Sequence, residues 1–145
     1  MGAEGQASKV LSLCGEKIAG LCEKEGIDLV VLFGSHARGV ERPTSDLDLA
    51  IQMEKGRSAS KLHLIYGLED IFYPHSVDLV VMTPLTAPLL LYEIFSAGKL
   101  VYEARPDVFS QAKLRAWKMY LDTAKLRRLE MQFLKNYVQR MKRVT

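Results

Sequence analysis

The 145-residue sequence has few of the residues that would cross-link or anchor a protein. Its two cysteines, Cys14 and Cys22, lie eight residues apart in a helical pattern, which is too far for a disulfide within one helix. We expect both to be small, reduced side chains, which indicates a cytoplasmic setting. No apolar run approaches the roughly 18 residues that cross a bilayer, and residues 1–6 do not resemble a secretory signal. We therefore expect neither a membrane anchor nor secretion.

Glycine and proline are absent after Pro106, so the remainder predicts a long C-terminal helix with at most one break. The charge there is uneven, because residues 111–145 carry a net +8 and residues 1–110 a net −5. A basic tail on an acidic body indicates an acidic partner or a polyanion, and a solvated helix face is the plainer alternative. Four aromatic residues near helical spacing favour packing in the core or against a partner helix over base stacking: Trp117, Tyr120, Phe133 and Tyr137.

Apolar patterns along the rest of the chain alternate between helical periodicity and short strand-like runs. They predict helices near residues 7–25 and 59–72, and a further helix that Pro84 and Pro88 open and Gly98 ends. They predict strands over 29–33, 47–53, 77–82 and 100–102. This order predicts an α/β (α+β) sandwich in which helices cover a small sheet. The connection between the first two strands is too short and irregular for a normal parallel crossover, so a mixed sheet is expected. We predict one domain, with residues 7–105 as a core and 106–145 as a helical extension.

The segment from Phe33 to Gly39 has the composition of a ligand-binding turn. Phe33 ends a buried strand, and Gly34 allows the backbone to turn sharply and approach a ligand closely. Ser35 follows at the predicted start of a short helix, where free backbone N–H groups and the hydroxyl make an anion-binding corner. Gly39 ends that helical turn. The segment therefore predicts a phosphate-binding corner.

Three carboxylates are expected beside this corner. Asp46 and Asp48 are two apart on a strand, so their side chains leave the same face, where they repel each other unless a cation lies between them. Mg²⁺ is the usual ion when phosphates complete the shell. Asp78 interrupts an apolar strand and is expected to reach the same cluster. Such a set describes a two-metal phosphoryl-transfer site, in which Asp78 would also help to deprotonate an acceptor hydroxyl.

The whole pattern resembles the signature of the DNA polymerase beta-like nucleotidyltransferase superfamily, Gly-Ser-x-Ala-Arg-Gly-x5-Ser-Asp-x-Asp-Leu. Residues 34–49 match every fixed position, and Asp78 looks like the third carboxylate of that superfamily. Residues 91–103 are similar to the minimal nucleotidyltransferases. In many prokaryotes these accompany an all-helical HEPN partner, as an antitoxin beside a ribonuclease toxin.

The resemblance implies a nucleotidyltransferase fold that uses Mg²⁺, with two ions expected, and a nucleoside triphosphate, usually ATP. The nucleoside monophosphate passes to a hydroxyl and pyrophosphate is released. By this likeness Asp46 and Asp48 bind both ions and Asp78 binds one. Gly34 and Ser35 hold the triphosphate, and Arg38 and Ser45 are further candidates for the nucleotide site. The antitoxin members transfer AMP to a tyrosine of the toxin, so a helical HEPN toxin is the expected partner.

Alternatives remain open at this point. A small-molecule acceptor is one, although 145 residues leave little room for an acceptor-binding domain. A non-catalytic module that neutralises its partner by contact is another, and an intact carboxylate set argues against it. Extension of nucleic-acid 3′ ends would use the basic tail on phosphates. Arg38 could instead pair with a carboxylate or brace the loop, and Ser45 could cap or orient Asp46. Arg42 is expected to be a solvated loop charge, and His63 and His75 to have surface or packing roles. His36 stands at a variable position of the motif and is assigned no chemistry.

Overall fold

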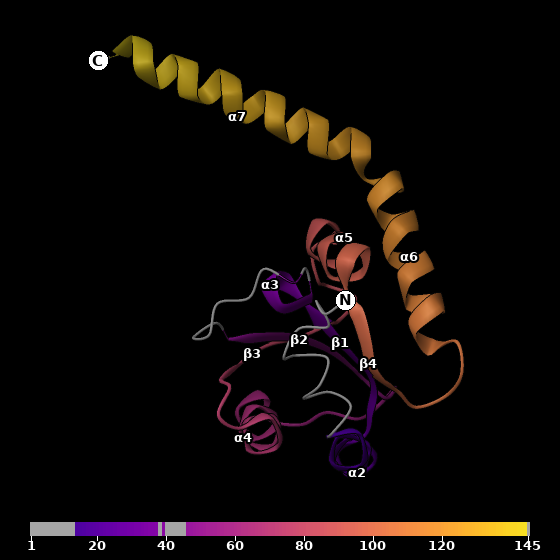
Figure 1. Ribbon diagram of the computed structural model, residues 1–145. Coiled ribbons are helices and arrows are strands. Elements are labelled where there is room, and N and C mark those ends of the chain that lie inside the picture. The colour runs from indigo at the N-terminus through magenta and orange to yellow at the C-terminus, as the bar shows by residue number, and fades with distance from the viewer. Residues whose placement is uncertain (1–13, 38, 40–45, 145) are drawn as a thin grey trace.

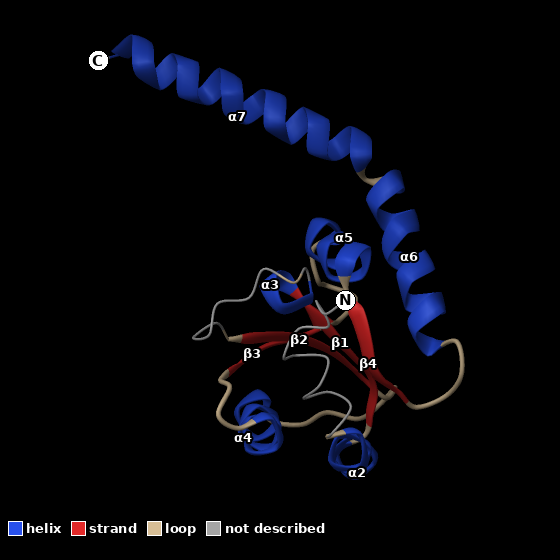
Figure 2. Cartoon of the chain, in the orientation of Figure 1, coloured by secondary structure: helices blue, strands red, loops and turns tan. Residues whose placement is uncertain are grey.

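A four-stranded mixed sheet forms the centre of the computed structural model, which describes residues 14–37, 39 and 46–144 (Figures 1 and 2). Its strands lie in the order β3-β2-β1-β4: β1 (Ile27–Phe33), β2 (Leu47–Met53), β3 (Val77–Val81) and β4 (Lys99–Glu103). β2 and β4 are antiparallel to β1, whereas β3 is parallel to β2. The predicted mixed sheet is confirmed, and β1 and β4 extend beyond their predicted bounds.

Helices cover both faces of this sheet (Figure 2). One apolar cluster joins the sheet to α2 (Gly15–Glu25) and α4 (Lys61–Phe72). A second cluster joins the opposite face to α5 (Pro88–Ala97) and α6 (Val108–Asp122). The short α3 (Gly34–Ala37) follows β1 directly, and α7 (Ala124–Val144) extends away from the body (Figure 1). The predicted sandwich is therefore confirmed.

The side chains of β2 alternate between these two clusters. Leu47, Leu49 and Ile51 are buried on the side of α2 and α4. Ala50 belongs to the cluster on the side of α5 and α6. Because successive side chains of a strand point to opposite faces, Asp48 shares the face of Ala50. The strand thus directs a carboxylate toward the α5 side of the sheet.

Local signals end the helices where the sequence predicts. α2 ends at Gly26, which has a left-handed φ of 75° and donates its N–H to the Cys22 carbonyl. The hydroxyl of Ser60 accepts a hydrogen bond from the His63 N–H at the start of α4. Pro88 begins α5, in the first-turn position that tolerates its missing N–H. The first predicted helix began at residue 7, and its part before Cys14 lies outside the described residues.

The predicted C-terminal helix is divided at Thr123 into α6 and α7. Val108, Ala112 and Ala116 of α6 are buried in the second cluster, so this helix packs on the core. None of the side chains of α7 that the structure describes is buried. Core packing is therefore wrong as an explanation for Phe133 and Tyr137, which are 69% and 54% exposed. The alternative of packing against a partner helix remains for these two residues.

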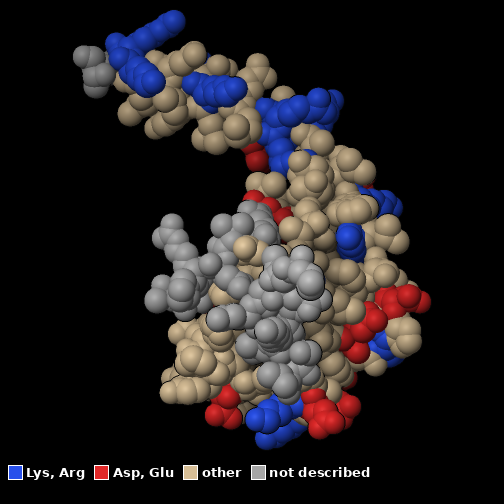
Figure 3. Space-filling view, viewed as in Figure 1, with Lys and Arg blue, Asp and Glu red and all other residues tan. Residues whose placement is uncertain are grey.

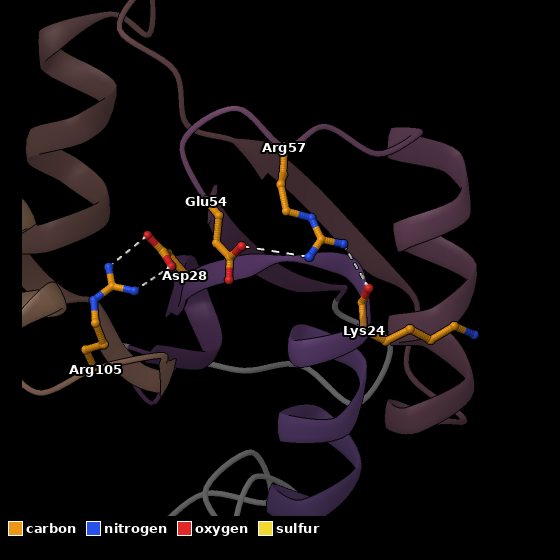
Figure 4. Close-up of polar contacts among 5 residues, drawn as sticks. All are labelled: Lys24, Asp28, Glu54, Arg57 and Arg105. Atoms are coloured by element: carbon orange, nitrogen blue, oxygen red, sulfur yellow. Dashed lines mark hydrogen bonds and ion pairs between the residues drawn. The ribbon is translucent and has the colours of Figure 1, made fainter.

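A polar network closes the end of the sheet that lies opposite Asp48 (Figure 4). The guanidinium of Arg105 donates to both carboxylate oxygens of buried Asp28, at 3.3 and 3.2 Å. Arg57 pairs with Glu54 at 3.8 Å and donates to the carbonyl of Lys24 at 3.1 Å. Pairing matters for Asp28 because a buried carboxylate without a partner is costly. The first contact ties β1 to the segment after β4, and the second group ties the turn after β2 to the end of α2; both lie away from the carboxylate site.

Both cysteines are free, as expected from their spacing. Burial raises the pKa of the Cys22 thiol to about 12, so the thiolate is suppressed at neutral pH. None of the helices in the described part of the chain is long and apolar enough to cross a bilayer.

We predict that Phe72→Ala lowers the free energy of unfolding by about 3–5 kcal/mol, because it removes a fully buried aromatic ring from the first cluster. Urea titration followed by circular dichroism measures the change. Leu85→Ala is the control, since Leu85 is 94% exposed and its truncation should change stability by less than about 0.5 kcal/mol. Equal losses in the two variants would contradict the assigned core.

Candidate active site

Two of the three expected carboxylates face each other across neighbouring strands. Asp48 and Asp78 are register partners in the parallel pair of β2 and β3. Asp46 lies immediately before β2 and is exposed. The prediction that Asp78 reaches the Asp48 cluster from the next strand is confirmed. Parallel pairing is the reason, because it places equivalent points of two strands side by side.

The electrostatics of Asp48 show that the cluster is short of positive charge. Burial is the largest of the effects that raise the pKa of this carboxyl above its usual value, followed by the charges of Asp78 and Asp46. A hydrogen bond with the Asp78 side chain raises it further, whereas His36 lowers it. Groups with a pKa perturbed by burial and like charge are typical of functional sites. A cation among these oxygens would relieve the repulsion.

Gly34 brings the backbone of the turn against this pair. It has a φ of 73°, a left-handed conformation that favours glycine. A Cβ atom at Gly34 would lie 2.9 Å from the Cγ of Asp48, so a side chain here would displace the carboxylate. The strand register also places the turn beside this carboxylate, because Phe33, the residue before Gly34, pairs with Asp48. The predicted phosphate corner, with half-buried Ser35 in α3, therefore adjoins the carboxylates.

Part of the predicted site falls outside the described residues. Arg38 and Ser45, which were candidates for the nucleotide site, lie there, as does Arg42. Among the residues that are described, no three His, Cys, Asp or Glu side chains are already arranged around one metal position. Asp48 and Asp78 are the preformed pair, and exposed Asp46 is the third carboxylate that a bound cation could recruit.

His36 is a residue whose place the sequence analysis missed. It is 5% exposed, and its charge lowers the pKa of Asp48, so the imidazole lies close to the carboxylates. Its ring meets that of His75 edge-on, with 5.8 Å between centroids. This contact links the turn after β1 to the segment before β3. No spacing rule signals it, because the two histidines are far apart in sequence and only packing brings them together.

A pocket of about 400 Å³ lies further along the same two strands, between α5 and α6. Its lining includes Gln52, Met82, Thr83, Leu91 and Arg115. Gln52 is four strand residues beyond Asp48, which corresponds to about 13 Å. This largely apolar pocket is thus separate from the carboxylate cluster, and the chemistry of the site does not depend on it.

Comparison with known proteins agrees with this geometry. The family model described as polymerase beta, nucleotidyltransferase matches residues 16–107, which is more than half of the chain. The chain therefore belongs to the polymerase beta nucleotidyltransferase family. A protein of Methanocaldococcus jannaschii, assigned by its name as a protein adenylyltransferase, is 36% identical over 56 residues. That match covers 38% of this chain and 60% of the relative, so it spans less than two thirds of the relative's length.

Two solved structures contain a chain with a fold similar to that of this protein. One is described as a toxin–antitoxin with AMP-PNP; its matching chain has a TM-score of 0.67 and 21% identity, over 83% of this chain and 98% of that chain. The other is described as a tri-AMPylated Shewanella oneidensis HEPN toxin in complex with an MNT antitoxin. Its matching chain has a TM-score of 0.63 and 19% identity, over 86% of this chain and 98% of that chain. At 21% and 19% sequence identity, the similarity to these two structures shows a shared fold alone.

Proposed function

We propose that this chain is a Mg²⁺-dependent nucleotidyltransferase that moves AMP from ATP to a tyrosine hydroxyl of a HEPN toxin, and that it thereby acts as the antitoxin. The observation that carries this proposal is the facing pair of Asp48 and Asp78 beside the turn at Gly34. The solved structures similar to this chain include an AMPylated HEPN toxin with its antitoxin, and the relative named as an adenylyltransferase supports the same chemistry.

The residues fit the metal that this chemistry needs. Carboxylate oxygens are hard ligands suited to Mg²⁺, and the raised pKa of Asp48 reflects negative charge that a cation would balance. Asp46 and Asp48 would hold two ions, and Asp78 would hold one of them. When bound, the ions neutralise charge on the phosphates and on the attacking and leaving oxygens.

The chain's own groups would then bind and orient the reactants. The backbone at Gly34 and the hydroxyl of Ser35 would cradle the triphosphate, with Arg38 and Ser45 as further contacts. Asp78 would accept the proton of the acceptor hydroxyl while the hydroxyl oxygen attacks the α-phosphorus of the triphosphate. The bond from that phosphorus to the bridging oxygen breaks, and pyrophosphate leaves. Positioning accounts for most of the catalysis, since no covalent intermediate with the protein is needed.

We extend the proposal to the layout of the chain. The catalytic core would occupy residues 7–105, and residues 106–145 would form a helical extension of the same domain. The extent of the family match, residues 16–107, supports this division. The first extension helix, α6, packs on the core, whereas α7 stands clear of it.

Incubation of the purified chain with Mg²⁺, ATP and a HEPN protein, sought among the genes next to its own, tests the proposal. We expect intact-mass spectrometry to show AMP added to the partner, and EDTA to prevent the addition. Asp46→Ala/Asp48→Ala should abolish transfer while leaving partner binding intact, because neither residue lies in the core or on α7. Tight binding without transfer, with all four nucleoside triphosphates tried, would instead support an antitoxin that acts by contact alone.

A further inference from the structure

The helix α7 presents an apolar face that the rest of the described chain leaves uncovered. Six of its apolar side chains, each more than half exposed, define what we call the arm face: Leu126, Leu129, Phe133, Leu134, Tyr137 and Met141. At 100° per residue they share one side of the helix with Met131 and Val138, in an apolar arc of roughly 200°. A monomer rarely exposes so large an apolar surface unless something binds there.

Contacts at the N-terminal end of α7 fix the direction in which the helix leaves the body. The ring of Tyr120 on α6 stacks on that of Tyr92 on α5, with 3.9 Å between centroids. The guanidinium of Arg127 lies 3.8 Å from the Tyr120 centroid and donates to the Thr123 hydroxyl. These contacts join α7 to α6 directly and, through the Tyr120 ring, to α5, and these two helices cover the second cluster. In the view of Figure 1, α7 runs from the top of α6 across the space above α5 and α3.

The width of the apolar arc indicates the kind of surface that covers it. An arc of about 100° is enough to pack a helix on one surface. An arc twice as wide is buried only when neighbours approach from two sides, as in a helix bundle. With 21 residues, α7 offers this face over about 30 Å. The geometry thus fits a groove between two helices of another protein.

The charges of α7 indicate which kind of partner binds its apolar face. Its seven basic residues against Glu130 give a net charge of +6, and Figure 3 shows Lys and Arg gathered along this arm. Two copies packed through α7 would bring two such helices together and repel each other. Glu130 lies inside the apolar arc, and so do Arg127 and Arg140. Lipid tails would surround these charges with no polar partner, whereas a protein surface can pair them. An acidic protein complements this charge best.

We propose that the arm face docks in a groove between two helices of an acidic helical protein, and that this protein is the acceptor of the nucleotidyl group. The inference rests on the proposed function for the identity of that acceptor. Docking along α7 would hold the acceptor above α5 and α3, so that its hydroxyl can reach the Asp48–Asp78 pair. The arm then governs how tightly the acceptor binds, and the carboxylates govern the rate of transfer.

Isothermal titration of the full chain with the same HEPN protein tests the docking surface. Phe133→Ala/Tyr137→Ala removes two aromatic rings from the arm face, and we expect the dissociation constant to rise about 100-fold, since buried aromatic anchors dominate interfaces. The matched control is Gln132→Ala/Gln139→Ala on the opposite side of the same helix, which should stay within about threefold of the parent. Circular dichroism should show equal helix content in both, because all four side chains are exposed.

Transfer kinetics and salt add independent readouts. The arm variant should raise the acceptor concentration for half-maximal transfer while leaving kcat unchanged, because Phe133 and Tyr137 act through binding alone. The association rate of the parent should fall as NaCl rises from about 0.05 to 0.5 M, because salt screens the basic side chains of α7. An association rate that does not change with salt would contradict an acidic partner.

The outcomes separate this inference from the proposed function. Transfer that proceeds equally well in the arm variant would overturn the docking surface and leave the proposed function standing. Arm-dependent binding without transfer would uphold the docking surface and overturn the proposed function. A free chain that is a dimer by light scattering, and that dissociates in the arm variant, would assign the face to a second copy. Arm-dependent binding to phosphatidylserine vesicles, with no binding to the HEPN protein, would assign it to lipid.

Discussion

Replacing Asp48 by Asn is expected to lower the rate of the proposed AMP transfer by at least about a thousandfold and to make the metal-free protein more resistant to heat. The loss of rate follows because Asn supplies no charge to hold the metal ions, whose charge stabilisation is worth several kcal/mol in the transition state. The gain in stability follows because the Asp48 carboxylate is half-buried beside Asp78 and Asp46, so its charge opposes folding.

The sign of this effect depends on pH. The folded protein raises the pKa of Asp48 above its usual 3.8, which means that the folded state binds a proton more tightly than the unfolded chain. Stability is therefore lost as the pH rises from that value through the raised pKa of the folded state. The advantage of the Asn variant should be present at neutral pH and should vanish below about pH 3.8. Mg²⁺ binding should weaken as the pH falls through the same window, because the ion needs the ionised carboxylate.

Thermal unfolding in EDTA, followed from pH 3 to 8, measures the stability of both proteins. Asp70→Asn is the matched control, because it removes an exposed carboxylate from α4 on the other side of the sheet. It should change neither the melting temperature at neutral pH nor the rate of transfer. Mg²⁺ and ATP at about 100 times their dissociation constant should add about 2.7 kcal/mol to the parent and little to Asp48→Asn. An Asn variant that melts lower than the parent at neutral pH would contradict the charge repulsion.

Gly34→Ala is expected to lower the rate of transfer by at least about a hundredfold. The new methyl group would meet the carboxylate of Asp48, and misplacement of a reacting group by about 1 Å is enough for such a loss. The left-handed backbone at Gly34 adds strain, since a residue with a Cβ adopts it reluctantly. Single-turnover transfer with saturating Mg²⁺ and ATP measures the change in the chemical step.

Gly20→Ala provides the control for this substitution. Gly20 lies in α2 with nothing within 4 Å of an added Cβ, and its φ is not left-handed. Alanine there should raise the unfolding free energy by up to about 1 kcal/mol through helix propensity and leave transfer unchanged. If Gly34→Ala bound Mg²⁺ and ATP normally and kept full activity, the close approach of the turn to Asp48 would have no role in the site.

Several features of this protein could be predicted because they depend on local order in the chain. The segment from Gly34 to Leu49 carries the motif in consecutive residues, and the alternation along β2 sets the direction of Asp48. Helix ends at Gly26 and Pro88 follow from the backbone preferences of those residues. The roles assigned to Asp46, Asp48 and Asp78 in metal binding stay predictions, as do those of Ser35, Arg38 and Ser45 in nucleotide binding.

Tertiary structure decided what depends on contacts between distant parts of the chain. Apolar patterns already placed Asp46, Asp48 and Asp78 at or beside strands, but it is the parallel pairing of β2 and β3 that puts Asp48 opposite Asp78. The contact of His36 with His75 has no sequence signal, because it arises from packing across the site. Periodicity likewise determined that residues 124–144 form an amphipathic helix. Only the folded chain decided that its apolar face is left exposed, because α5 and α6 already fill the sheet face that it would otherwise cover.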